Sequence, residues 1–135
     1  MLRSQILNAV EIILKELPYF ARVVYWQDLP SDFGQDWCTF RDVEETYTEV
    51  GRQHECRLTV EIELVLFGGD SPARAQLRLA ELIEELGRDR TLGGTARQVQ
   101  IIRTATEVQT AGLRACSTCL EIAVIYRTSL FNLGG

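Results

Sequence analysis

Apolar side chains recur at helical spacing along the first seventeen residues, and Pro18 follows them. They are Leu2, Ile6, Val10, Ile13, Leu14 and Leu17. This spacing predicts an amphipathic helix that ends before the proline, which cannot continue the hydrogen-bond ladder. Residues 20–26, FARVVYW, are β-branched and aromatic and predict a strand. The turn formers of residues 28–36, DLPSDFGQD, predict a loop.

Two long strands are expected next, on either side of Gly51. Between Trp37 and Val50 neither the odd nor the even positions are cleanly apolar, so we expect this strand to extend beyond the core. Residues 54–67 alternate well, as a half-buried strand does. Their apolar face comprises Leu58, Val60, Ile62, Leu64 and Leu66. The two segments predict a long β-hairpin with its base in the core and a polar, charged tip.

A second helix is expected after the hairpin. Asp70 or Ser71 can cap it, and Pro72 suits its first turn. Its apolar stripe is formed by Ala75, Leu79, Leu82, Ile83 and Leu86. Gly87 stands where a helix often ends in the left-handed conformation, so we expect the helix to end there.

Residues 97–110 and 116–128 predict two closing strands, with a turn at Gly112. The expected order is α-β-β-β-α-β-β. It predicts an α+β fold, in which an antiparallel or mixed sheet is covered on one face by two helices. The sequence contains no internal repeat and no linker, so residues 1–135 are expected to form a single domain.

Composition narrows the class of protein. The net charge is −5, whereas a nucleic-acid-binding domain normally carries a basic patch or stripe. No apolar segment is long enough to span a bilayer. The first helix contains Glu11, Lys15 and Glu16 and lacks a small-residue cleavage site, so it does not resemble a signal peptide. We therefore expect the chain to be made in a reducing cytoplasm, with its four cysteines as free thiols.

The cysteines and the single histidine are the first candidates for chemistry. Cys116 and Cys119 form a CxxC, and His54 and Cys56 add two further potential zinc ligands. Residues three apart on a strand point to opposite faces, however, and a redox CxxC belongs at the start of a helix. We therefore expect no metal site, and cysteines that act as small buried hydrophobes. His54, which any Cys-His or Ser-His pair would require, is expected to be solvated near the hairpin turn.

Carboxylates are abundant on the hairpin, at Asp42, Glu44, Glu45, Glu49, Glu61 and Glu63. Paired carboxylates can cleave glycosides or bind metal ions. Alternating acidic residues are also typical of the outer side of a half-exposed sheet, where they oppose edge-to-edge aggregation. We favour an acidic surface that faces solvent or a partner, and expect no catalytic residue and no cofactor.

Two adjacent glycines, Gly93 and Gly94, lie in the stretch RDRTLGGT of residues 88–95. A phosphate-binding loop would join a strand to the start of a helix. Here the loop joins a helix to a strand, so no helix N-terminus is available to hold an anion. The glycines instead predict a turn that requires positive φ angles.

The order of elements and several short stretches resemble the tail terminator (tail completion, minor tail) proteins of long-tailed bacteriophages. The similarity includes the first helix, VEIELVLFG at 60–68, ELIEEL at 81–86, the D-x-TLGG stretch at 89–94 and VIYRT at 124–128. It extends over nearly the whole chain in layout. The loop at 28–36 and the CSTC at 116–119 have no counterpart in the family.

The resemblance implies a structural virion protein rather than an enzyme. Such proteins form a hexameric ring on the last ring of the tail tube, end tube growth and provide the docking surface for the head. The implied partners are copies of the chain, the tail tube protein, a neck, head-completion or connector protein, and in some phages the sheath. DNA would pass through an acidic lumen without specific binding, because like charges repel. The implied location is the head-proximal end of the virion tail, after synthesis in the host cytoplasm.

Three alternatives stay open at this point: a neck or head-tail joining protein of the same virion, a small enzyme that uses the carboxylates or Cys/His, and an adaptor of unrelated function. A ring needs a heterologous interface that closes. A hairpin that leaves its own core can lie against a neighbour or add to its sheet. From the signs of the charges and their positions in the sequence, we expect acidic hairpin residues of one subunit to face arginines of the next. These are Asp42, Glu44, Glu45 and Glu49 on the acidic side, and Arg74, Arg78, Arg88 and Arg90 on the basic side.

Overall fold

The computed structural model describes residues 2–17, 20, 22–25, 35–109 and 115–129. It contains two helices, α1 (Leu2–Glu16) and α2 (Ser71–Arg88). Its five strands are β1 (Arg22–Tyr25), β2 (Trp37–Val50), β3 (Gln53–Phe67), β4 (Gln98–Gln109) and β5 (Ala115–Ser129). The predicted order and the α+β class are confirmed. Most of the loop predicted at 28–36, and the turn predicted at Gly112, lie outside the described residues.

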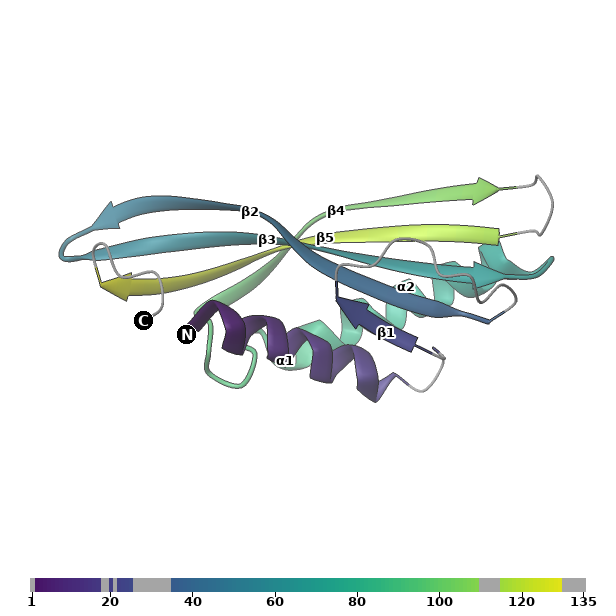
Figure 1. The fold of residues 1–135 in the computed structure, drawn as a ribbon, viewed down its shortest axis with the longest axis horizontal. Coiled ribbons are helices and arrows are strands. Elements are labelled where there is room, and N and C mark those ends of the chain that lie inside the picture. The colour runs from purple at the N-terminus through teal and green to yellow at the C-terminus, as the bar shows by residue number, and fades with distance from the viewer. Residues whose placement is uncertain (1, 18–19, 21, 26–34, 110–114, 130–135) are drawn as a thin grey trace.

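The strands form one sheet in the order β1-β2-β3-β5-β4. β1 runs parallel to β2 and the other pairs are antiparallel, so the sheet is mixed. β3 and β5 are its two central long strands, paired from Gln53–Ser129 to Phe67–Ala115. Both helices lie on the same side of the strongly twisted sheet (Figure 1). The prediction of a sheet covered on one face is therefore confirmed.

The main core lies between the helices and the sheet. Its largest fully buried side chains are Ile6, Val10 and Leu14 of α1, Leu82 of α2, Phe40 of β2, Leu58, Ile62, Leu64 and Leu66 of β3, and Leu120, Ile122 and Tyr126 of β5. A second, smaller cluster on the sheet contains Trp37, Val65 and Phe67. It occupies the base of the hairpin, on the face opposite the helices, because these residues alternate with the inward-facing ones.

The hairpin of β2 and β3 has a buried base and an exposed tip. On β2, Trp37, Cys38 and Phe40 are buried, whereas Val43 and all but one of the following residues are exposed. The tip lies beyond the start of α1 (Figure 1). The prediction that β2 leaves the core is confirmed.

A β-bulge between Asp42 and Glu44 corrects the predicted faces of β2. Simple alternation placed Glu45 on the same face as Trp37. The extra residue of the bulge inverts the alternation, so Glu45 turns toward the helix-bearing face and pairs with Arg3 of α1. Even with the faces corrected, Glu45 and Glu49 lie on the helix-bearing face, because the tip half of β2 has left the core.

The predicted ends of α2 need two corrections. Asp70 is the N-cap residue, but its side chain makes no capping hydrogen bond and instead pairs with Arg74. Gly87 does not end the helix, which continues through Arg88. The last turn persists because Arg88 pairs with Glu84 and with Glu85, at spacings that stabilise a helix. The left-handed backbone comes later, in the glycine loop.

The glycine loop, residues 89–96, is organised around Asp89. Its carboxylate accepts hydrogen bonds from the Thr91 amide at 3.2 Å, the Thr91 hydroxyl at 2.9 Å and the Gly93 amide at 2.7 Å. Leu92, Gly93 and Gly94 have φ angles of 49°, 70° and 89°. The prediction that the glycines serve a turn with positive φ is confirmed. The loop inserts the Leu92 side chain, which is only 2% exposed, into the main core.

These hydrogen bonds predict a pH dependence of folding. The bonds to Thr91 and Gly93 lower the pKa of Asp89 below its ordinary value of 3.8. Since the folded-state pKa is depressed, the stabilisation is present above the unfolded-state pKa and is lost as pH falls through the folded-state pKa. We expect the Asp89→Asn variant to be less stable than the wild type at pH 7 and to approach it at pH 2, as measured by urea denaturation. An equal deficit at both pH values would show that the charge of Asp89 is not involved.

Candidate assembly surface

The candidate zinc ligands do not come together. Cys116 is buried on the helix-bearing face, whereas Cys119 is half-buried on the opposite face. Cys56 pairs with Tyr126 and Cys116 with Leu66, ten residues along the same strand pair, or roughly 33 Å at about 3.3 Å per residue. Among the described residues, no group of three or more His, Cys, Asp and Glu side chains could hold a metal ion.

Three of the cysteine thiols, those of Cys38, Cys116 and Cys119, are poorly suited to nucleophilic or redox chemistry. Burial strongly raises the pKa of Cys38 and also raises that of Cys116. Burial, together with the carboxylates of Glu61 and Glu63, raises the pKa of Cys119 to about 12. Reactive cysteines need a depressed pKa, because the thiolate is the nucleophile. His54 stacks obliquely on Tyr47, with ring centroids 5.8 Å apart, and is half-buried rather than fully solvated as expected.

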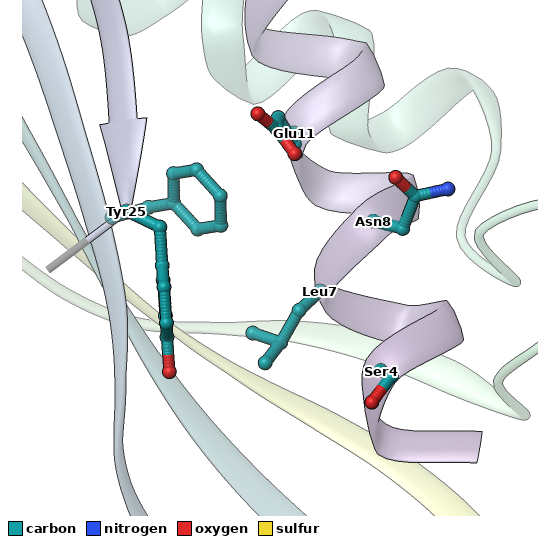
Figure 2. Close-up of a pocket in the computed structure, with 6 residues that line it drawn as sticks. Ser4, Leu7, Asn8, Glu11 and Tyr25 are labelled. Atoms are coloured by element: carbon teal, nitrogen blue, oxygen red, sulfur yellow. The ribbon is translucent and has the colours of Figure 1, made fainter. Parts of the chain in front are cut away.

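An open cavity of about 230 Å³ lies between α1 and the edge of the sheet. It is lined by Ser4, Leu7, Asn8 and Glu11 of α1, and Figure 2 shows the Leu7 side chain pointing toward Tyr25 of β1. The cavity is smaller than the roughly 300–1,000 Å³ of typical ligand sites. Two of its polar groups already have partners in the chain, since Glu11 pairs with Lys15 and the Tyr25 hydroxyl donates to Asp42. It is therefore a weak candidate for a substrate site.

The four acidic residues predicted to form an interface have different environments. Glu44 and Glu49 are exposed along the tip half of β2. Asp42 is half-buried and accepts the hydrogen bond from Tyr25. Glu45 is held within its own chain, with a side chain only 5% exposed. Only Glu44 and Glu49 are thus placed to meet a partner.

Glu45 belongs to a polar cluster that joins α1 to the hairpin. Its carboxylate pairs with the Arg3 guanidinium and accepts a hydrogen bond from the Tyr126 hydroxyl. Arg3 also donates to the Tyr47 hydroxyl at 3.4 Å. Burial raises the pKa of Tyr126 to about 12, so its hydroxyl stays protonated and can donate. Reversing the charge of Glu45 would disturb this cluster, so it is a poor test of subunit pairing.

The four predicted basic partners also make contacts within the chain. Arg74 pairs with Asp36 and Asp70 and donates to the Phe67 carbonyl. Arg78 pairs with Glu81, at 3.2 Å. Arg88 pairs with Glu84 and Glu85 but keeps a side chain that is 62% exposed, and Arg90 donates to the Val99 carbonyl. Arg74 and Arg78 therefore support the folded chain, and only Arg88 and Arg90 are on an exposed surface.

Sequence reasoning missed a more distinctive feature, the two open edges of the sheet. Among the strands that the structure describes, β1 covers β2 at Trp37–Phe40, and the rest of β2 has no strand neighbour on that side. β4 is the opposite edge, and it is exposed on both faces from Ile101 to Val108. Most of the exposed large hydrophobic residues lie on these two strands: Val43, Tyr47 and Val50 on β2, and Ile101, Ile102 and Val108 on β4. The signal in the sequence was the presence of aliphatic residues in strands without a clean apolar face.

Among the described residues, no helix is long and apolar enough to cross a membrane. No protein-family model and no curated protein matches the chain. Similar folds occur in 37 chains of solved structures. One of these is 16% identical to this chain, and the match covers 90% of this chain and 94% of that one, with a TM-score of 0.52. At 16% identity the likeness shows the fold alone.

Proposed function

We propose that this chain is a tail terminator protein of a long-tailed bacteriophage. In this role it forms a ring, hexameric as in the family it resembles, that caps the tail tube. The ring ends tube polymerisation and provides the surface on which the neck and head dock. The chain is a structural protein of the virion and not an enzyme.

The observation that carries the proposal is the pair of open, partly apolar sheet edges. An exposed edge is normally protected by lysine, proline or a covering element, because it is a template for another chain. Here one edge is β4 and the other is the tip of β2, so the two surfaces differ. A protein that meets copies of itself through two different surfaces forms a ring when the rotation closes.

Two further observations support the proposal. The D-x-TLGG stretch, by which the chain resembles the tail terminator family, forms an ordered turn. Asp89 accepts hydrogen bonds from the turn, and Leu92 packs in the core. The four cysteines, the histidine and the cavity beside α1 offer no assembled catalytic site among the described residues. A neck or head-tail joining protein of the same virion would use the same surfaces and is the second candidate.

An in-frame deletion of the gene in the virus that encodes it separates these candidates. Loss of a tail terminator should give tail tubes of uncontrolled length and full heads without tails, as seen by electron microscopy of lysates. A plasmid copy of the wild-type gene should restore normal particles. Loss of a neck protein should instead leave tails of normal length. Infectious particles of normal appearance without the gene would rule out both roles.

A further inference from the structure

The two open edges carry opposite charges at matching positions. The exposed acidic residues Glu44 and Glu49 lie on the tip of β2, opposite Thr59 and His54 of β3. They are five strand positions apart, or about 17 Å at roughly 3.4 Å per residue. An odd separation puts them on different faces. Glu44 is on the outer face, and Glu49 is on the helix-bearing face.

The other edge has two exposed arginines with the same spacing. Arg103 lies opposite Glu121 of β5, and Arg97 donates its amide to the Ile125 carbonyl at the start of β4. The bulge between Ile101 and Arg103 absorbs one residue, so the two arginines are also five strand positions apart. Arg103 is on the outer face with Glu121, and Arg97 is two residues before the buried Val99, on the helix-bearing face.

We propose that β4 of one chain pairs antiparallel with the tip of β2 of a second copy, joining their two sheets edge to edge. In this register Glu44 meets Arg103 on the outer face and Glu49 meets Arg97 on the helix-bearing face. The side chain of Arg103 is 61% exposed and pairs with Glu121 only through Nε, so its terminal nitrogens can meet a second carboxylate. The main-chain hydrogen bonds supply affinity, and the charges fix the register.

The directions of the strands agree with this pairing. β2 and β5 run the same way, and β4 runs opposite to both, because β3 lies antiparallel between β2 and β5. A neighbour related by a simple rotation therefore presents its β2 antiparallel to β4, with its helices on the same side. Pairing can extend over residues 97–104 of β4 and 43–49 of β2, since the β4 bulge takes up one residue. It ends where β1 covers the neighbour's Trp37–Phe40.

The inference rests on the part of the proposed function in which the chain assembles with copies of itself. The sequence predicted that the hairpin of one copy meets arginines on and just after α2 of the next. In the contact proposed from the structure, the hairpin instead adds as a strand to β4. The Arg88 and Arg90 side chains are not required for the contact, and neither is Glu45.

Charge exchange between the edges tests the contact. The variants Glu44→Arg/Glu49→Arg and Arg97→Glu/Arg103→Glu each place like charges across the junction. We expect each to assemble at least tenfold more weakly than the wild type in size-exclusion chromatography with light scattering. An equimolar mixture should recover assembly with both variants in equal amounts, since each then meets its complement. A control, Glu84→Arg/Arg88→Glu on exposed positions of α2, should assemble like the wild type.

Hydrogen exchange measured on the same samples tests the strand addition itself. Amides of residues 98–104 should exchange more slowly in the wild-type assembly than in the monomeric variants. The inference would be overturned if either variant alone assembled like the wild type, or if the mixture did not recover assembly. It would also be overturned if the β4 amides were unprotected, or if the wild-type chain stayed monomeric at millimolar concentration. Whether the chain limits the length of tail tubes is a separate test, which bears on the proposed function. A monomer that still caps tubes overturns only the edge contact, whereas assemblies that leave tube length unchanged overturn only the function.

Discussion

Replacing Arg3 with alanine is expected to lower the free energy of unfolding by about 3–5 kcal/mol, the range for breaking a buried ion pair. The Glu45 carboxylate, only 5% exposed, would keep its hydrogen bond from Tyr126 but lose its positive partner. The Arg3 side chain is 34% exposed and can reach water when Glu45 is removed instead. Glu45→Ala should therefore cost less, about 1.5–3 kcal/mol.

Urea denaturation of the two single variants and the double variant measures this asymmetry. The double variant should be more stable than Arg3→Ala, because it no longer buries an unpaired carboxylate. Arg88→Ala is the matched control, since its ion pairs are exposed and should contribute at most about 1 kcal/mol. A smaller cost for Arg3→Ala than for Glu45→Ala would contradict the buried position of Glu45.

Leu92→Ala is expected to destabilise the fold by about 2–5 kcal/mol, as other buried leucine truncations do. The side chain is 2% exposed, and it enters the core from a loop whose backbone is fixed by Asp89. The remaining cavity cannot easily collapse, because Leu92 itself has a left-handed backbone and its turn is fixed by the hydrogen bonds to Asp89.

Leu77 on α2 offers a matched control for this substitution. It is the same residue type but 53% exposed, so Leu77→Ala should change the free energy of unfolding by less than about 0.5 kcal/mol. Thermal and urea denaturation of both variants should give unchanged m-values and a large difference in midpoint. Equal effects of the two substitutions would show that Leu92 does not contribute to the core.

Much of the fold could be predicted from the sequence because its signals are local and periodic. The stripe from Ile6 to Leu14 indicated α1, and the alternation from Leu58 to Leu66 indicated β3. The glycines at 93 and 94 indicated positive φ angles, since other residues pay a steric penalty there. The cysteine positions also indicated opposite faces, because a strand has a period of two.

The features that were missed depend on the tertiary structure. The bulges after Asp42 and Ile101 insert one residue without a composition signal, and each inverts the faces that follow. The pairing of Arg3 with Glu45 joins residues more than forty positions apart. Gly87 stayed helical because arginine and glutamate pairs support the last turn of α2.

The same dependence explains why the predicted interface changed. The charges of Arg74, Arg78 and Glu45 and their positions in the sequence predicted that they lie on a subunit surface. Each of them instead pairs within the chain. The open edges could not be read from the sequence, since which strands lie at the edges depends on the strand order. Those edges, rather than the charged face of α2, are where we expect copies of the chain to meet.

The length of tail tubes assembled in vitro tests the proposed function most directly. Tube protein from the same genome would be polymerised with and without this chain, and tube lengths and ends measured by negative-stain electron microscopy. The account predicts shorter tubes as the chain is added, each with a ring of extra density at one end. Tubes of unchanged length with bare ends, in the presence of excess folded chain, would contradict it.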